Sequence, residues 1–140
     1  MGKVVYSYYV LDLLHKGHIR YMEKAKQIAG ENGISIVGIL TDKAVMERKE
    51  KPVLSFEDRM KIANAIRYND IVVPQDTYSP IPNATIIRPD ILIESPSHKP
   101  EDIDNYKTIV KMWGGKVVIV DYTKEISSSI IKERIKNADR

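Results

Sequence analysis

The sequence predicts one doubly wound α/β domain, in which a parallel sheet of about five strands is covered by helices on both faces. Short continuous apolar runs, typical of strands buried on both faces, alternate along the chain with longer amphipathic segments. No linker, repeat or low-complexity segment interrupts this alternation over residues 1–140. A length of 140 residues also suits a single hydrophobic core. We therefore expect one domain, with ligands at the carboxyl ends of its strands.

The first half of the chain contains three expected strands and two expected helices. β-branched and aromatic residues at 3–11 favour a strand. The helical spacing of His18, Met22, Ala25 and Ala29 favours a helix that ends near Gly30. Ser55, with an acidic residue three positions later, is a typical helix N-cap. The expected elements are a strand at 3–11, a helix at 16–30, a strand at 34–40, a strand end and charged segment at 41–51, a helix at 56–68 and a strand at 70–74.

The second half continues the same alternation after a segment rich in proline. Residues 75–89 carry three prolines and are expected to be mostly loop. A strand at 90–94, a helix at 100–114, a strand at 116–122 and a helix at 127–138 capped by serine follow. Strands joined by crossover helices of this kind form right-handed units, so the fold is expected to be Rossmann-like.

Composition limits the classes of function. The chain has 22 basic and 19 acidic side chains, a net charge of +3, which suits a phosphate-bearing small ligand but is too weak to indicate a nucleic-acid partner. It has no cysteine, which excludes disulfides and thiolate metal sites. No apolar run approaches the roughly 20 residues that cross a bilayer, and the first residues show no secretory pattern. We therefore expect a cytoplasmic protein without a membrane partner.

Two histidines stand where the first expected strand turns into the first expected helix. His15 and His18 flank Gly17, which allows a close approach of the backbone to a phosphate. A helix start offers N–H groups and a positive dipole end to an anion, and imidazoles there can stabilise the charge of a phosphoryl-transfer transition state. In the alternative interpretation, His18 packs in the core with the apolar stripe and His15 is an exposed loop residue. Neither GxGxxG nor GxxxxGK[ST] occurs, so the usual dinucleotide and P-loop sites are not indicated.

Serine and basic side chains extend the predicted phosphate site. Ser127, Ser128 and Ser129 open the last helix, and we interpret them either as a plain N-cap or as a second anion site facing the same cleft. The basic set comprises Arg48, Lys49, Lys51, Arg59 and Arg67. The 48–51 cluster follows the second strand, within reach of a polyphosphate tail. Arg59 is expected to lay its stem against the sheet and to bring its head into the cleft, although each cation taken alone could be a solvated surface charge.

These motifs together resemble a known superfamily. "HKGH" (15–18) is an HxGH motif, "ISSSIIKERI" (126–135) is similar to an ISTTxIK-type motif, and "SFEDRMKIANAIRYNDIVVP" (55–74) resembles the segment between them. The resemblance, over about residues 3–136, is to the cytidylyltransferase-like branch of the HxGH nucleotidyltransferases, which have the HUP, or adenine nucleotide alpha-hydrolase-like, fold. It is closest to glycerol-3-phosphate cytidylyltransferases and to the nucleotidyltransferase domains linked to phosphoenolpyruvate mutases, which "PQDTYSPIPNATIIRPDILIES" (74–95) especially resembles.

The resemblance implies transfer of a nucleoside monophosphate, with CMP favoured, from a nucleoside triphosphate to a small phosphate or phosphonate acceptor, with release of pyrophosphate. Mg²⁺ would accompany the triphosphate, and no side chain is singled out as a certain metal ligand. His15, His18 and Lys49 would be catalytic, and Arg67 would lie at a homodimer interface or the edge of the active site. The implied nucleotide- or phosphate-binding residues are Tyr9, Val10, Leu11, Asp12, Gly17, Arg59, Ser95, His98, Ile126, Ser127, Ser128 and Ser129.

Three segments depart from the family's patterns. Tyr8 and Tyr9 stand near the position of an expected glycine before Asp12, "YTKE" (122–125) lacks the arginine and glycine that usually precede the serine motif, and "ESPSH" (94–98) replaces a GDDW-like segment. Two alternatives therefore stay open. One is an adenylyltransferase of the pantetheine-phosphate, nicotinamide-mononucleotide or sugar-phosphate type. The other is a nucleotide-binding or regulatory domain without turnover.

Overall fold

Five parallel strands form one sheet, as the alternation of segments predicts. The computed structural model describes residues 2–121 and 128–138, with side chains of the last segment described from residue 131 to 137. The strands are β1 (Val4–Tyr9), β2 (Ile34–Leu40), β3 (Ile71–Gln75), β4 (Ile91–Glu94) and β5 (Lys116–Ile119). Their order is β3-β2-β1-β4-β5, and every neighbouring pair is parallel. The order reverses between β1 and β4, which is where a doubly wound sheet opens a crevice for ligands.

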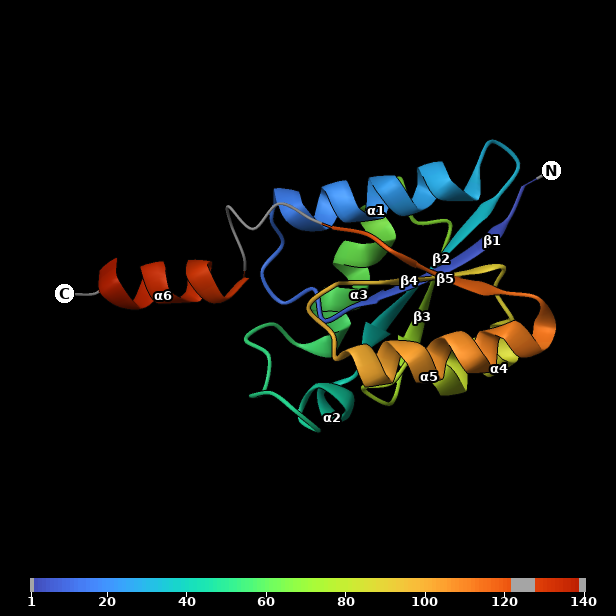
Figure 1. Cartoon of the computed structure of the whole chain (residues 1–140). Helices are drawn as coiled ribbons and strands as arrows, with labels where there is room; N and C mark the ends of the chain where they lie inside the picture. The colour runs from blue at the N-terminus through green and yellow to red at the C-terminus, as the bar shows by residue number, and fades with distance from the viewer. Residues whose placement is uncertain (1, 122–127, 139–140) are drawn as a thin grey trace.

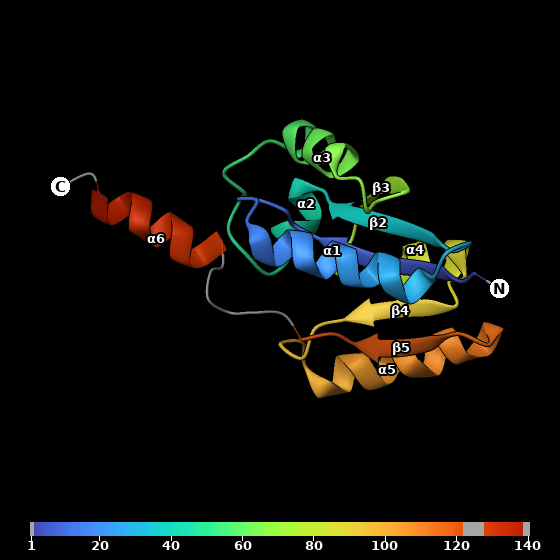
Figure 2. The same cartoon turned by 90° about the horizontal axis from the view of Figure 1, so that it is seen from above.

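Helices cover both faces of this sheet. They are α1 (Lys16–Ala29), α2 (Asp42–Val45), α3 (Phe56–Ala65), α4 (Ile81–Ile87), α5 (Pro100–Val110), a 3-10 turn (Lys111–Trp113) and α6 (Ser128–Ala138). α1 lies over one face, and α4 and α5 lie over the other (Figure 1). In both views α6 stands apart from these layers, beyond the carboxyl ends of the strands (Figures 1 and 2).

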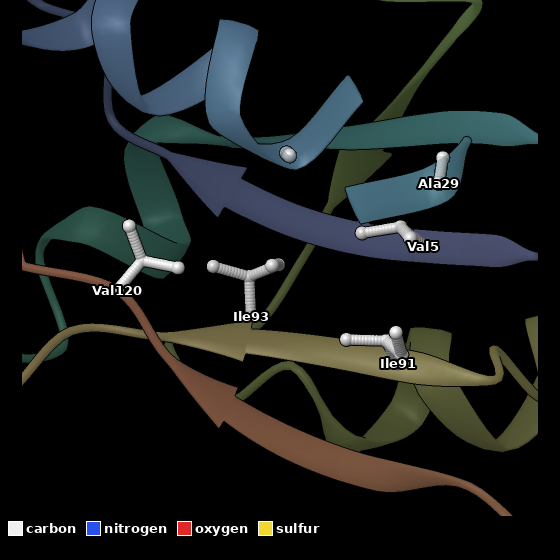
Figure 3. Close-up of a cluster of buried hydrophobic side chains, with 6 residues drawn as sticks. Val5, Ala29, Ile91, Ile93 and Val120 are labelled. Atoms are coloured by element: carbon white, nitrogen blue, oxygen red, sulfur yellow. The ribbon is translucent and has the colours of Figure 1, made fainter. Parts of the chain in front are cut away.

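Alternate residues of each strand separate the core into two layers. Val5 on β1 packs with Ala29 of α1 and with Ile91 and Ile93 of β4, and Val120, which follows β5, belongs to the same cluster (Figure 3). On the opposite face, a second cluster joins Tyr6 and Leu92 to Tyr106 and Val110 of α5. Because successive side chains of a strand point to opposite faces, the continuous apolar runs of the sequence serve both layers.

Helix α1 is held at its carboxyl end as well as by its buried face. Met22, Ala25 and Ala29 are buried against the sheet. Lys26, in the last turn, donates to an Asp70 carboxylate oxygen at 2.6 Å and to the Gly33 carbonyl at 3.2 Å, and the Lys3 N–H donates to the Ala29 carbonyl. These contacts fix the position of the helix whose other end opens the ligand crevice.

Several element boundaries differ from the sequence prediction. The segment 75–89 is not mostly loop, because it contains α4, which Pro80 and Pro82 start: proline suits the first turn of a helix, where its missing N–H would have no partner. The four-residue helix α2 within 41–51 is also new, and its N-cap is Thr41, whose side chain accepts from the Ala44 N–H. β1 ends at Tyr9 rather than at residue 11, α3 ends at Ala65 rather than at 68, and β5 ends at Ile119 rather than at 122.

Candidate functional site

A cavity of about 580 Å³ opens at the carboxyl ends of β1 and β4, where the strand order reverses. Its walls come from the turn after β1, the start of α1, the end of β2, the segment after α2 and the loop after β4. The lining includes these predicted site residues: Tyr9, Val10, Leu11, Asp12, His15, Gly17, His18, Lys49, Ser95 and His98. It also includes residues that were not predicted to be site residues, among them Tyr8, Tyr21, Tyr78, Glu94, Ser97 and Lys132.

The turn between β1 and α1 brings both histidines to this cavity. Leu11, which is buried, has a positive φ of 59°, so the chain reverses direction directly after the strand. His15 is then the N-cap of α1, and its Nδ1 accepts the Gly17 N–H at 3.0 Å. In return, the His15 N–H donates to Nδ1 of His18 at 3.2 Å. The two imidazoles thus form a reciprocal capping box, a role that a hydroxyl and a carboxylate or amide usually fill.

These hydrogen bonds determine the state of both rings. An Nδ1 that accepts a hydrogen bond carries no proton, so the neutral ring holds its proton on Nε2. Burial lowers the pKa of His15, and burial together with the nearby His15 lowers the pKa of His18 to about 4. The ring centroids are 4.0 Å apart, a distance at which two positive charges would repel strongly. The cavity therefore meets two neutral imidazoles, each with an Nε2–H to donate.

The start of α1 differs from the expectation of free backbone donors. The Gly17 N–H is already bound to His15, and the His18 N–H is bound to the His15 carbonyl at 3.0 Å. An anion at this helix start would therefore meet imidazole Nε2–H groups in place of these two backbone N–H groups. His18 is half-buried and lines the cavity, so the alternative in which it packs in the core does not describe its position.

Asp12 connects three segments at the edge of the cavity. Its buried carboxylate accepts the Val53 N–H at 3.0 Å and the Leu54 N–H at 2.9 Å, and it forms an ion pair with Lys132 of α6. Burial raises the pKa of Asp12, but the N–H groups of Leu54 and Val53 and the Lys132 ammonium outweigh burial and lower it overall. The carboxylate thus acts in this structure as an acceptor that orders the cavity rim.

The predicted cations lie in different surroundings. Lys49 lines the cavity, with its Nζ 5.9 Å from the Tyr78 ring centroid, and the neighbouring Arg48 guanidinium is 4.8 Å from the same centroid. Lys51 is exposed and does not line the cavity. Arg67 is exposed beyond α3, where its guanidinium donates to the Tyr68 hydroxyl at 3.0 Å. The structure therefore places Lys49 at the site and Arg67 away from the cavity lining.

Arg59 corrects the expectation that its head emerges into the cleft. The side chain is fully buried, and its guanidinium donates to the carbonyls of Val10 and Leu40 at 2.8 and 2.7 Å and to Asp42 at 2.7 Å. The guanidinium satisfies the carbonyls at the ends of β1 and β2 and pairs with the first residue of α2. It therefore supports the cavity from behind and does not reach it.

A second polar cluster lies where β4 ends. Glu94 is buried, its carboxylate accepts the Tyr8 hydroxyl at 2.7 and 2.8 Å, and its Oε2 lies 2.7 Å from Nδ1 of His98. Burial, with the Glu94 charge, raises the pKa of Tyr8 far above its usual value, so its hydroxyl remains a neutral donor. The aromatic at position 8 gave no signal of this role in the sequence, because its partner lies 86 residues away.

The serine motif falls largely outside the described side chains. Ile126 and Ser127 lie outside the described residues, and Ser128 and Ser129 are the first two residues of α6, of whose side chains nothing is described. One turn further on, Lys132 reaches the cavity through Asp12. Within residues 2–121 and 131–137, no group of three or more acidic or histidine side chains could hold a metal ion. In the same part of the chain, no helix has the length and apolar character needed to cross a membrane.

The chain is similar in sequence to known proteins. The family model described as cytidylyltransferase-like matches residues 10–134. The bifunctional protein HldE of Syntrophotalea carbinolica is 31% identical over 134 residues, which cover 94% of this chain and 26% of that protein. HldE of Coxiella burnetii is 32% identical over 128 residues, covering 90% of this chain and 26% of its own length. The chain thus spans about a quarter of the length of these curated relatives.

Solved structures agree on the fold. A lipopolysaccharide core biosynthesis protein from Thermoplasma volcanium superposes with a TM-score of 0.72 at 20% identity, over 87% of this chain and 98% of that one. A protein of unknown function from Archaeoglobus fulgidus gives a TM-score of 0.62 at 19% identity, over 85% and 98%. At these identities the likeness concerns the fold alone. Because the family model covers nearly the whole chain, including both histidines of the capped turn, the chain belongs to the cytidylyltransferase-like family of nucleotidyltransferases.

Proposed function

We propose that the chain transfers a nucleoside monophosphate from a nucleoside triphosphate to a phosphate group of a small acceptor, and releases pyrophosphate. The observation that carries the proposal is the pair His15 and His18, whose Nδ1 atoms are bound within the capped turn so that both Nε2–H groups remain for a ligand in the cavity. Neutral donors that are fixed before the ligand arrives suit a transition state in which negative charge builds on phosphoryl oxygens.

In the proposed reaction, an oxygen of the acceptor phosphate attacks the α-phosphorus in line. The new oxygen–phosphorus bond forms as the bond from the α-phosphorus to the bridging oxygen breaks, and the electron pair leaves with pyrophosphate. A phosphate dianion needs no base to become a nucleophile, so no proton has to be removed. The Nε2–H groups of His15 and His18 donate to non-bridging oxygens of the α-phosphoryl group, and Lys49 and Lys132 supply positive charge along the cavity wall.

A magnesium ion that arrives with the triphosphate would neutralise part of its charge and assist the departure of pyrophosphate. Two of the carboxylates that line the cavity, those of Asp12 and Glu94, are engaged by protein donors. In such sites Mg²⁺ is usually coordinated by substrate phosphates and water, with few protein ligands. Among the serines proposed to hold the β- and γ-phosphates, Ser128 and Ser129 begin α6.

For the acceptor, we propose a phosphorylated sugar or a related small phosphate or phosphonate. CTP is the proposed nucleotide by family resemblance, and ATP is the alternative, because the sugar-phosphate adenylyltransferases share both end motifs. We further propose a homodimer formed near Arg67, which sedimentation of wild type and an Arg67→Glu variant would test.

Pyrophosphate release tests the proposal directly. The protein is incubated with Mg²⁺, each of the four nucleoside triphosphates, and a panel of sugar phosphates, glycerol 3-phosphate and alkylphosphonates. Pyrophosphate release that needs both CTP and an acceptor supports the cytidylyl reaction. If, of the four triphosphates, only ATP supports release with an acceptor, the adenylyl alternative is identified. Triphosphate binding by calorimetry without turnover on any pair would instead indicate a nucleotide-binding domain and would overturn the proposed reaction.

A variant of His18 tests the role of the capped turn. His18→Ala should lower turnover by about two to three orders of magnitude, as loss of a transition-state donor does. Circular dichroism and thermal unfolding establish whether the fold is retained. Undiminished turnover in a folded variant would show that the His18 Nε2–H takes no part in the reaction.

A further inference from the structure

Lys49 differs from Lys132, another lysine of the cavity lining, in what holds its ammonium group. Lys132 forms an ion pair with the Asp12 carboxylate, which offsets part of its positive charge. Within the part of the chain that the structure describes, Lys49 forms no ion pair, and its Nζ lies over the Tyr78 ring, 5.9 Å from the centroid. The face of an aromatic ring attracts a cation without cancelling its charge. The Lys49 ammonium is therefore held and is still available to an anion.

The backbone of Lys49 is fixed, whereas its side chain is long and exposed. The N–H groups of Arg48 and Lys49 donate to the Val45 carbonyl at 3.1 and 2.9 Å, which joins this turn to the end of α2. A lysine side chain has a flexible stem, and ordering it when a ligand binds costs conformational entropy. A partner that orders the ammonium before the ligand arrives removes part of that cost.

The Tyr78 ring is held by its own surroundings. It packs against a buried cluster formed by the end of β2 and by α2, namely Leu40, Ala44 and Val45. The Tyr78 N–H donates to the Glu47 carboxylate at 3.3 Å, and the Tyr78 carbonyl accepts from Nε2 of Gln75 at 3.3 Å. Gln75 is buried, and its Oε1 accepts the Tyr6 hydroxyl at 2.6 Å. The ring is therefore a fixed surface against which a mobile lysine can settle.

Arg48 approaches the same ring from outside the cavity lining. Its guanidinium lies 4.8 Å from the Tyr78 ring centroid, and its Nη1 is 3.5 Å from an Asp102 carboxylate oxygen in α5. Lys49 and Tyr78 both line the cavity, whereas Arg48 does not. Of the two cations at the ring, Lys49 is thus the one that a ligand in the cavity meets.

These contacts give Tyr78 a role in the site. We propose that Tyr78 is a positioning residue, whose ring holds the Lys49 ammonium at the cavity wall for the phosphates of the nucleoside triphosphate. The inference rests on the proposed function, in which Lys49 supplies positive charge to the site. Contacts between a cation and an aromatic ring are modest at exposed positions, so the ring contributes a few-fold to the affinity for the triphosphate.

A double-mutant cycle tests whether Tyr78 acts through Lys49. Calorimetry measures the binding of CTP and of ATP, each with Mg²⁺, to wild type, Tyr78→Leu, Lys49→Met and the double variant. Tyr78→Leu keeps apolar bulk but removes the ring, and it should weaken binding by about three- to fivefold. In the Lys49→Met background the same substitution should have no further effect. Equal losses in both backgrounds, or no loss in the wild-type background, would overturn the proposal.

Two further variants separate the ring from general effects on the fold. Tyr78→Phe keeps the ring and should bind the triphosphate as wild type does. Tyr68→Leu removes a comparable ring outside the cavity lining, 5.1 Å from the Arg67 guanidinium, and should leave triphosphate binding unchanged. Thermal unfolding establishes that each variant is folded. If Tyr78→Phe and Tyr78→Leu lose the same affinity, the ring is not what positions Lys49, and the proposal is wrong.

Nuclear magnetic resonance detects the contact without a ligand. The ring current of Tyr78 should shift the ε-methylene protons of Lys49 upfield in wild type and in Tyr78→Phe, and this shift should disappear in Tyr78→Leu. Lys49 resonances that are unchanged in Tyr78→Leu would contradict the positioning role. If the wild type binds a triphosphate without turnover, the proposed reaction fails, and the cycle still decides the role of Tyr78. If the wild type binds no triphosphate, the proposed function and this inference fail together.

Discussion

The lowered pKa of His18 predicts how the stability of the fold depends on pH. Burial and the nearby His15 lower this pKa from 6.5 to about 4. The unfolded chain therefore takes up a proton near pH 6.5, whereas the folded chain resists it until the pH is much lower. His18 thus destabilises the fold progressively as the pH falls from about 6.5 to about 4, and has no such effect above that window.

The size of the effect follows from the two pKa values. Relative to neutral pH, the linkage relation gives a loss of unfolding free energy of about 1.4 kcal/mol at about pH 5.5 and about 2.5 kcal/mol at about pH 4.5. His18→Gln should remove this loss while keeping the capping box, because glutamine is a usual residue at that position of the box. The carboxylates that also titrate in acid, such as Asp12 and Asp70, are common to both proteins and cancel in the comparison.

The assay is urea unfolding of wild type and His18→Gln in a series of buffers between about pH 7.5 and pH 4.5. With a slope of about 2 kcal/mol per molar urea, the difference between the two midpoints should change by about 1 M across the series. The change should favour the variant at low pH. A difference that stays constant with pH would show that His18 titrates normally, and would refute the capped, neutral imidazole pair.

Three further substitutions test the support of the cavity. Arg59→Met should lower the unfolding free energy by about 3–5 kcal/mol in urea, because the carbonyls of Val10 and Leu40 and the Asp42 carboxylate all lose their donor. Lys61→Met, on the exposed side of the same helix, should change the unfolding free energy by less than about 0.5 kcal/mol. Equal effects of the two substitutions would contradict the buried role of Arg59. Asp12→Asn should cost about 1–3 kcal/mol in the same measurement, and an unchanged midpoint would show that its N–H contacts do not hold the rim. Lys49→Met should slow pyrophosphate release by about tenfold or more, whereas Lys43→Met, outside the cavity, should leave it unchanged.

The features that the sequence predicts correctly depend on local patterns. The apolar runs of β1, β2 and β4, and the two histidines on either side of Gly17, each reflect preferences of residues that are neighbours along the chain. The carboxyl ends of parallel strands necessarily meet at one edge, so the clustering of the turn after β1 with the loop after β4 also follows. The prolines of 75–89 led to a wrong loop prediction, because proline is typical of loops and also of the first turn of a helix, where Pro82 stands in α4.

The contacts that the sequence does not predict join residues far apart in the chain. An arginine is usually a surface residue, and Arg59 is buried because the carbonyls of Val10 and Leu40 and the carboxylate of Asp42, 17 to 49 residues away, meet at the same place. Likewise, Tyr8 gains its role from Glu94, and Asp12 from Val53 and Leu54. No periodicity or motif predicts these long-range contacts, since they depend on how the ends of different strands converge in three dimensions.

The paired histidine cap also has a mechanical consequence. Helix α1 has 14 residues and is therefore about 21 Å long, a rigid rod with the His15 and His18 rings at one end and the contacts of Lys26 and Ala29 at the other. Because the rings are bonded to the backbone of the first turn, they move with the rod as one body. A displacement of the carboxyl end of α1 would thus shift both Nε2–H groups together. Their spacing would be preserved, and their orientation toward a ligand in the cavity would change.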